Sequence, residues 1–217
     1  MTGFRACLID VYDTVLSCDF AAHRSELPVL AGVEADEWHD AFVLHAEGLG
    51  VGRTNFAEVF ENALRSCGRE PDPAVVRQLV QQDRELLNTT AQLHADAVPL
   101  LTSLRARGIA TAFVSNCSEN TRGLLDHLGL SQLVDALVLS CEVGSAKPDA
   151  GIFQAAAAAL DVALADAVFV DDQPAFCAGA AALGITAVRI DRTGAAAKDG
   201  EIVITSLAEL DDYFPRT

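Results

Sequence analysis

The chain has 217 residues, with 31 acidic against 15 basic side chains and a formal charge of −16. This length is enough for one large domain, or for a core domain with an insertion. The excess of negative charge repels phosphate backbones, which excludes nucleic-acid binding through a basic face. It also leaves carboxylates that could bind a hard cation. Hydrophobic residues make up 51% of the chain, yet no apolar run is long enough to span a membrane.

The cysteine pattern and the first residues indicate the compartment. The six cysteines form no C-x-x-C pair, so we expect reduced thiols rather than a disulfide framework. The chain does not open with a charged-then-apolar signal segment. We therefore expect a cytoplasmic protein without nucleic-acid or membrane partners. The sequence leaves its oligomeric state open.

The first element is a short apolar run over residues 4–9 that ends at Asp10. Such a run is typical of a buried strand. Asp13 and Thr14 follow closely, and open α/β sheets bind their ligands at the carboxyl ends of such strands. An acidic turn without function would fit the same residues, because Asp and Thr are common in turns.

The next region, from residue 19 to about residue 97, has a different pattern. Apolar residues recur at helical spacing, which predicts about four amphipathic helices and no convincing strand between them. Glycine-containing breaks at 32–33, 48–52 and 68–73 separate them. A helical block of this size after a single strand predicts a small separate bundle.

From residue 98 onward, strands and helices alternate. Short turns between them indicate parallel strands joined by right-handed crossovers. Polar residues follow the ends of strands at Asp10, Ser115–Asn116 and Asp171–Asp172, and these positions share one edge of a parallel sheet. The predicted fold is α/β, a Rossmann-like parallel sheet with an inserted all-helical unit. We predict helices at 99–107, 119–128, 149–160 and 174–183, strands at 109–114, 136–139, 167–170, 185–190 and 202–204, and a helical turn at 206–210.

Four motifs in order resemble those of the haloacid dehalogenase-like (HAD) hydrolase superfamily. They are Asp10-Val11-Tyr12-Asp13-Thr14, then Val114-Ser115-Asn116, then Lys147-Pro148-Asp149, and lastly Phe169-Val170-Asp171-Asp172. The resemblance implies a core of residues 1–16 and 97–217 and a helical cap of the C1 type at residues 17–96. A cap that closes over the site excludes water and favours a small-molecule substrate.

The resemblance also implies the chemistry. It makes Asp10 the nucleophile, which forms an aspartyl-phosphate that water then hydrolyses. It implies a Mg²⁺ ion held by Asp10, Asp171, Asp172 and the backbone carbonyl of Tyr12. Because adjacent carboxylates repel one another, a divalent cation would stabilise them, and Mg²⁺ prefers such oxygen ligands.

Further residues take supporting roles by the same resemblance. Ser115 would hold the phosphoryl group, and Lys147, one of only two lysines, would neutralise Asp10 and the transferring oxygens. Thr14 would brace the first loop, and Asn116 would support the phosphate site. In the glycine-rich loop of the cap, Arg53 could bind a substrate anion, with the glycines giving hinge freedom. Helix caps and surface side chains would account for the same residue types.

One position departs from the pattern of the family's phosphatases. They carry a second aspartate as general acid/base two residues after the nucleophile, where this chain has Tyr12. A tyrosine, with a pKa of about 10, is a poor base at neutral pH, and losing acid/base help costs about 10²–10⁴ in rate. The sequence therefore predicts a phosphohydrolase that is slow or uses a good leaving group, such as an acyl phosphate or phosphoanhydride.

Two alternatives stay open. Tyrosine at this position is typical of the family's metal-independent 2-haloacid dehalogenases, although the pair Asp171–Asp172 would be unfavourable without a cation. The second alternative is a non-catalytic phosphate-binding protein that kept the fold.

Overall fold

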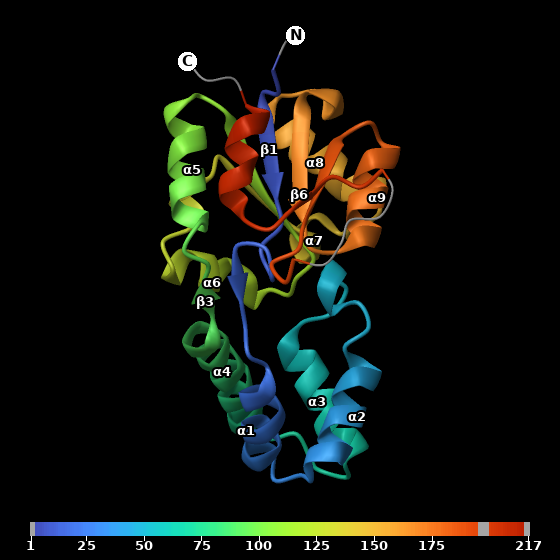
Figure 1. Ribbon diagram of the computed structural model, residues 1–217. Coiled ribbons are helices and arrows are strands. Elements are labelled where there is room, and N and C mark those ends of the chain that lie inside the picture. Colours follow the sequence, from blue (N-terminus) through green and yellow to red (C-terminus); the bar gives the residue numbers. More distant parts are fainter. Residues whose placement is uncertain (1–2, 195–199, 215–217) are drawn as a thin grey trace.

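The computed structural model describes residues 3–194 and 200–214. Its central element is a six-stranded parallel sheet in the order β5-β4-β1-β6-β7-β8 (Figure 1). The first strand, β1, lies between β4 and β6, in register with both. The strands are β1 Ala6–Ile9, β4 Ala110–Ser115, β5 Ala136–Leu139, β6 Ala167–Asp171, β7 Thr186–Ile190 and β8 Val203–Ile204.

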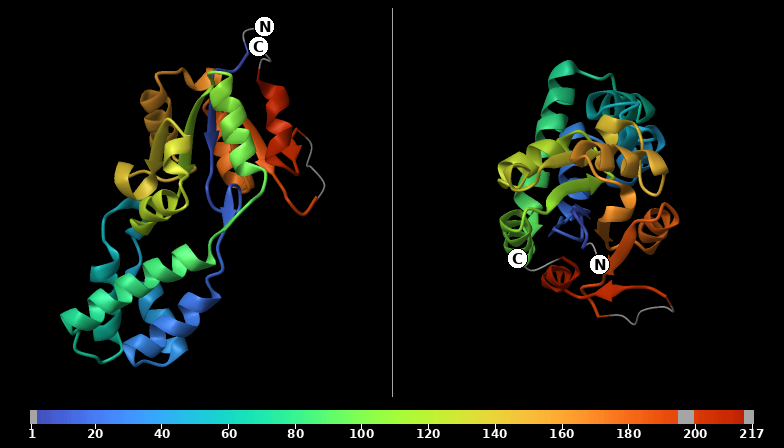
Figure 2. Two further views of the ribbon diagram at one scale, coloured as in Figure 1. Left: turned by 90° about the vertical axis from the view of Figure 1, so that its left-hand side faces the viewer. Right: turned by 90° about the horizontal axis from the view of Figure 1, so that it is seen from above.

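Helices cover both faces of this sheet, as the apolar run of β1 requires (Figure 2). Cys7 and Ile9 point toward one face and pack under α5, α6 and η4, whereas Ala6 and Leu8 point toward α8 and α9. These helices are α5 Ala97–Ala106, α6 Asn120–His127, α8 Ala150–Leu160, α9 Pro174–Ala182 and the 3-10 helix η4 Leu207–Tyr213. Two short 3-10 turns, η2 Ser131–Leu133 and η3 Leu164–Asp166, complete this part.

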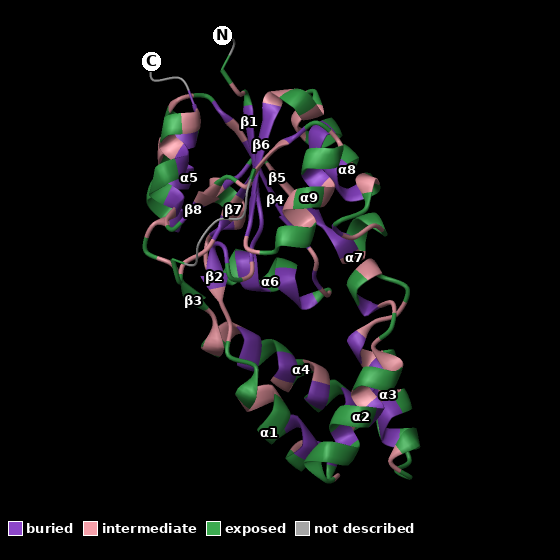
Figure 3. Ribbon diagram, turned by 45° about the vertical axis from the view of Figure 1, so that its right-hand side comes forward, coloured by how far each residue is buried: buried purple, intermediate pink, exposed green. Residues whose placement is uncertain are grey.

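A second unit of four helices lies at one end of the sheet, away from both termini (Figure 1). It has an apolar core of its own, in which Phe60 stacks on Trp38 at 5.7 Å and on Phe56 at 5.5 Å between ring centroids. Its outer surface is largely exposed (Figure 3). The helices are α1 Ala21–Ala31, α2 Ala35–His45, α3 Phe56–Ser66 and α4 Pro73–Thr90.

Two connections join this helical unit to the sheet. They pair as short antiparallel strands, β2 Leu16–Ser17 and β3 Gln92–Leu93, and the amide of His94 donates to the carbonyl of Val15 at 3.0 Å. Both strands lie outside the run of four helices, so the prediction of no strand between these helices is confirmed for the described residues; the pair itself was not predicted, because two-residue strands carry no periodic pattern. The predicted limits of the cap, 17–96, fall at this strand pair and stay a prediction.

A third contact comes from the glycine-rich loop, where the 3-10 helix η1 Leu49–Val51 lies against α7 Ser140–Val143. Ser140 donates a hydrogen bond to the carbonyl of Gly50 at 2.5 Å. Gly52 has φ +68°, and a Cβ there would lie 2.0 Å from the carbonyl oxygen of Cys141. Only glycine therefore fits at position 52, and the loop is a tight contact with the core.

Most predicted elements are present within one or two residues of their expected limits. Strand 136–139 is reproduced in full, and Gly129, with φ +67°, follows α6 in the left-handed conformation that commonly ends a helix. The short helix α7 was not predicted. All six cysteines, each in the described part of the chain, are unpaired. Among the described residues, no helix combines the length and the apolarity needed to cross a membrane.

Candidate active site

The centre of the site is Lys147, whose ammonium group lies between two carboxylates. Its Nζ is 2.5 Å from Oδ1 of Asp10 and 2.6 Å from Oδ2 of Asp171. The side chains of all three are almost fully buried. Asp10 directly follows β1 and Asp171 ends β6, so the pairing of these two strands brings both acids to one edge of the sheet. The structure thus brings together the first, third and fourth motifs.

Burial and mutual interaction shift the pKa values of these three side chains. Burial raises the pKa of Asp10 and of Asp171, while the nearby Lys147 ammonium opposes the rise in each. Burial alone would lower the pKa of Lys147, but the two carboxylates raise it. The amine is therefore charged at neutral pH, and it neutralises one negative charge of the cluster.

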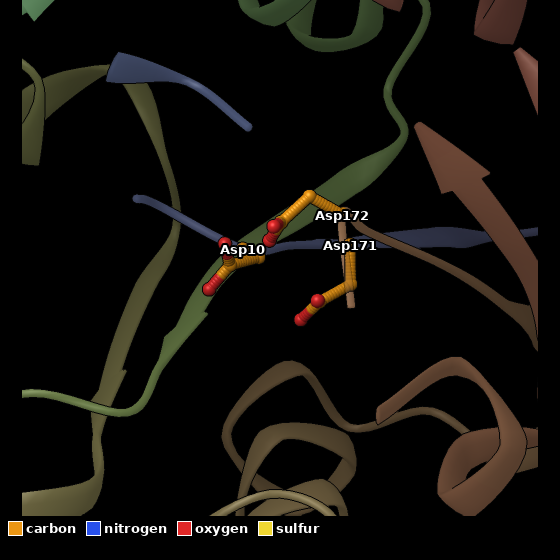
Figure 4. Close-up of side chains that lie close together, drawn as sticks. All are labelled: Asp10, Asp171 and Asp172. Carbon is orange, nitrogen blue, oxygen red and sulfur yellow. The ribbon is translucent and has the colours of Figure 1, made fainter. Parts of the chain in front are cut away.

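Asp172 completes a set of three carboxylates (Figure 4). Asp10, Asp171 and Asp172 each offer an oxygen, and these oxygens lie within 4.8 Å of one another. The backbone amide of Gln173 donates to Asp171 at 2.7 Å, and its side-chain amide donates to Asp172 at 2.6 Å. With all three acids ionised and Lys147 charged, −3 and +1 leave −2. Hard oxygen donors with this residual charge fit Mg²⁺.

Two buried hydroxyls near this edge are unsatisfied. The side-chain oxygens of Thr14 and Ser115 are buried and have no hydrogen-bond partner within the described ranges. Ser115 ends β4, which pairs with β1, so it lies at the same edge of the sheet as Asp10. Buried hydroxyls without partners are unfavourable, and anionic oxygens of a ligand could satisfy them.

Asn116 holds Lys147 in place. Its side-chain amide donates to the carbonyl of Lys147 at 2.8 Å and accepts from the backbone amide of Lys147 at 2.7 Å. These paired bonds link the second motif to the third. Asn116 thus positions Lys147, and its support of a phosphate site stays a prediction.

The side chain of Tyr12 is engaged elsewhere. Its hydroxyl lies 2.9 Å from Oγ1 of Thr121, and burial raises the pKa of the phenol above its ordinary value. The phenol is therefore neutral at physiological pH, which makes it a weak candidate for a base. Asp13 is exposed and adopts φ 60°. It therefore does not lie buried beside Asp10 in the place of the missing aspartate. Coordination through the carbonyl of Tyr12 stays a prediction.

A cavity of about 650 Å³ adjoins the site, between Tyr12 and Asn116 and the helices α1 to α4. Arg53 does not line it. Arg53 lies in a separate depression of about 370 Å³, with Cys141 and Glu142 among its neighbours. The suggestion that Arg53 binds substrate stays a prediction, and the described contacts do not link it to the acid cluster.

One polar group at this cavity was not predicted. Asp83 of α4 is buried, accepts a hydrogen bond from Asn120 of α6 at 2.7 Å, and lies 3.7 Å from the ring nitrogen Nε2 of His23. It thereby connects the helical unit to the sheet unit. A signal was available in the sequence, because Asp83 lies at helical spacing on the same apolar face as Leu79 and Leu86.

The comparisons with known proteins agree with this geometry. The model of the haloacid dehalogenase-like hydrolase family matches residues 4–184. The chain belongs to this family. For this HAD-like hydrolase, the predicted family and the predicted parallel sheet are both confirmed.

Individual relatives include phosphatases and dehalogenases. The chain is 37% identical over 122 residues to the phosphatase MT3486 of Mycobacterium tuberculosis, a match that spans 55% of each chain. It is 29% identical over 201 residues to (S)-2-haloacid dehalogenase 1 of Pseudomonas sp. strain CBS-3, covering 88% of this chain and 86% of the relative. Among solved structures, a HAD phosphatase from Thermococcus onnurineus superimposes with a TM-score of 0.71 at 24% identity, covering 96% of both chains.

Proposed function

We propose that this HAD-like hydrolase is a Mg²⁺-dependent phosphohydrolase that acts on a small phosphorylated molecule with a good leaving group. The observation that carries the proposal is the cluster of Asp10, Asp171 and Asp172, which Lys147 neutralises only in part. Without a metal, Asp171 would still pair with Lys147, but the charge of Asp172 would add repulsion to the cluster, whereas a divalent cation would offset it. Bound there, Mg²⁺ would neutralise charge on the phosphoryl oxygens.

In the proposed reaction, individual residues carry out each step. A carboxylate oxygen of Asp10 attacks phosphorus, the bond from phosphorus to the leaving oxygen breaks, and that oxygen departs with the electron pair. Lys147 remains charged and stabilises the negative charge beside Asp10. The unpaired hydroxyls of Thr14 and Ser115 can donate to phosphoryl oxygens. Water then attacks phosphorus, the bond between phosphorus and the Asp10 oxygen breaks, and a proton of the water passes to a phosphate oxygen or to solvent, which releases inorganic phosphate and restores the Asp10 carboxylate.

Tyr12 limits the choice of substrate. Its hydroxyl is bonded to Thr121 and holds its proton, so the described site lacks the family's acid beside the leaving oxygen. An alkoxide would need that proton, whereas a carboxylate or another stable anion leaves without it. Acyl phosphates and phosphoanhydrides are therefore the preferred substrates.

A second candidate is a hydrolytic 2-haloacid dehalogenase. Tyr12 favours it, because halide also leaves without a proton, and the 29% identity to (S)-2-haloacid dehalogenase 1 extends over most of both chains. The same Asp10 would attack carbon in place of phosphorus. The additional acids Asp171 and Asp172 argue against it.

The test compares the two reactions under matched conditions. Acetyl phosphate and 2-chloropropionate are incubated with the protein in Mg²⁺ and in EDTA, and release of phosphate and of chloride is measured. We expect phosphate release that needs Mg²⁺ and is lost in Asp10→Asn. Asp13→Asn is the matched control, because it removes the same charge from an exposed position and asparagine tolerates positive φ. Chloride release that persists in EDTA, without phosphate release, would contradict the proposal.

A further inference from the structure

The cavity beside the site is walled mainly by apolar side chains of the helical unit. Two of them are unusually exposed for their type, Phe20 at 50% and Val43 at 58%. Exposed apolar surface that lines a cavity marks a binding site rather than a packed core. The apolar wall includes Phe20, Leu27, Trp38, Phe42, Val43 and Phe56.

Most polar groups in the wall have partners within the protein, and Nδ1 of His23 is a buried atom that has none among the described residues. Asp83 is bonded to Asn120 and lies near His23, Asn116 is bonded to Lys147, and the hydroxyl of Tyr12 is bonded to Thr121. A ligand rich in hydroxyl groups would lose its bonds to water on entering and find few replacements. An apolar group has no such cost.

Apart from the buried Asp83, the charged side chains of this cavity lie at its exposed parts. Arg24, Asp36 and His39 line it and are each exposed. Exposed charges of both signs are solvated, so they do not select strongly for one charged ligand. The binding preference of the cavity comes from its apolar wall.

Its position makes it the place for the leaving group. The cavity reaches Tyr12 and Asn116, which flank the phosphoryl site: Tyr12 follows Asp10 by two residues, and Asn116 follows Ser115 and holds Lys147. A phosphoryl group between Asp10 and Ser115 would direct the remainder of its molecule toward the helical unit.

We propose that this cavity binds an apolar leaving group, so that the substrate is a phosphorylated aromatic molecule, either an aromatic acyl phosphate or an aryl phosphate. This inference rests on the proposed phosphohydrolase activity. The two substrate types share one chemistry, an apolar ring attached to an oxygen that departs as a stable anion when its bond to phosphorus breaks. Both therefore suit a site in which Tyr12 replaces the acid. A released carboxylate stays an anion at neutral pH, and a released phenoxide takes its proton from solvent after it leaves.

A binding experiment tests the cavity without catalysis. Trp38 is the only tryptophan of the chain and lines the cavity, so its fluorescence reports on occupancy. We expect benzyl alcohol to change this fluorescence in a saturable manner and glycerol to leave it unchanged. Val43→Asp should weaken the benzyl alcohol response at least fivefold. Leu44→Asp is the matched control, because Leu44 is 68% exposed, adjacent in sequence and outside the cavity lining.

A kinetic experiment tests the substrate class. Benzoyl phosphate and acetyl phosphate have carboxylate leaving groups of similar acidity and differ chiefly in apolar size. We expect kcat/KM at least tenfold higher for benzoyl phosphate, and a fall of that ratio at least fivefold in Val43→Asp but not in Leu44→Asp. A comparison of kcat/KM for phenyl phosphate with kcat/KM for benzoyl phosphate shows whether the enzyme prefers an aryl phosphate or an aromatic acyl phosphate.

The outcomes separate the two proposals. If both acyl phosphates are hydrolysed at equal kcat/KM and Val43→Asp leaves their ratio unchanged, the inference is overturned and the phosphohydrolase stands. If the protein hydrolyses neither compound while benzyl alcohol saturates the Trp38 response, the proposed function fails, and with it the assignment of a phosphorylated substrate. No saturable response to benzyl alcohol would also overturn the inference.

Discussion

The acid cluster consists of charged side chains, whereas the adjoining cavity is lined mainly by apolar ones. At the sheet edge, Lys147 lies between Asp10 and Asp171, and ion pairs determine the arrangement. In the helical unit, Trp38 and Phe42 pack around Phe60, and apolar contacts determine it. The first region has the groups for breaking a bond and the second has the surface for selecting a molecule. Changes to the first should therefore affect all substrates alike, and changes to the second should alter the ratio between substrates.

The largest expected effect comes from the nucleophile. Asp10→Asn should lower kcat for benzoyl phosphate and acetyl phosphate equally, by about 10⁴-fold or more, because no covalent intermediate can form. Binding of benzyl alcohol near Trp38 should persist, since the apolar wall is unchanged. Steady-state kinetics and tryptophan fluorescence measure the two effects. Equal loss of binding and turnover would mean that the two regions are not separable.

Lys147→Met should have the next largest effect. It leaves Asp10 and Asp171 buried without their cation, which costs about 3–5 kcal/mol in the free energy of unfolding, and it lowers kcat about 10²–10³-fold for both acyl phosphates. Added Mg²⁺ should restore part of the stability, because it also neutralises the carboxylates. Urea unfolding with and without Mg²⁺ measures this. A variant as stable as the parent protein in EDTA would show that the pairs contribute little.

Tyr12→Asp should sharpen the comparison by adding an acid to the core site alone. We expect turnover of an alkyl phosphate to rise about tenfold or more, because its alkoxide needs a proton, while turnover of benzoyl phosphate changes little. Tyr12→Asn, which has a similar shape without an acid, is the control. A decrease with both substrates in Tyr12→Asp would indicate that the tyrosine is itself adapted to the native reaction.

A smaller effect concerns the ion pair that braces the first loop. Arg192 donates to both oxygens of Asp96 at 3.0 Å and to the carbonyl of Thr14 at 2.7 Å. Burial would raise the pKa of Asp96, but hydrogen bonds from Arg192, Ser206 and the amide of Leu207 lower it to about 2.

A carboxyl with a lowered pKa stabilises the fold above its unfolded value of 3.8, and this stabilisation is lost as the pH falls toward about 2. Asp96→Asn should therefore lose about 1 kcal/mol at pH 7 and show a weaker decline between about pH 4 and pH 2. Urea unfolding across this pH range measures both. The same decline in the variant as in the parent protein would contradict the assignment to Asp96.

The sheet and its polar edge were predictable because their signals are local. Apolar runs end at Asp10, Ser115 and Asp171, and parallel pairing of β1, β4 and β6 necessarily brings these ends together. Lys147 was placed by its motif, and the structure adds its two ion pairs. Each of these predictions depended on one short segment and one general property of parallel sheets.

The cavity was not predictable in the same way. Trp38 and Phe42 lie at helical spacing, which is typical of side chains in the core of a bundle, and Trp38 is indeed buried, yet both also line the cavity. Side chains from four separate helices form the wall, and their mutual placement depends on tertiary packing. The β2–β3 pair and the contact of Gly52 with Cys141 escaped prediction for a related reason, because each joins segments distant in sequence.

The central claim is that Asp10, Asp171 and Asp172 form a site for a divalent cation beside the nucleophile. Calorimetric titration of Mg²⁺ into the parent protein and into Asp172→Asn tests it most directly, since this substitution leaves both ion pairs of Lys147 in place. We predict saturable binding to the parent protein, weakened at least tenfold in the variant. Absence of Mg²⁺ binding to the folded parent protein, at concentrations up to several millimolar, would contradict the account.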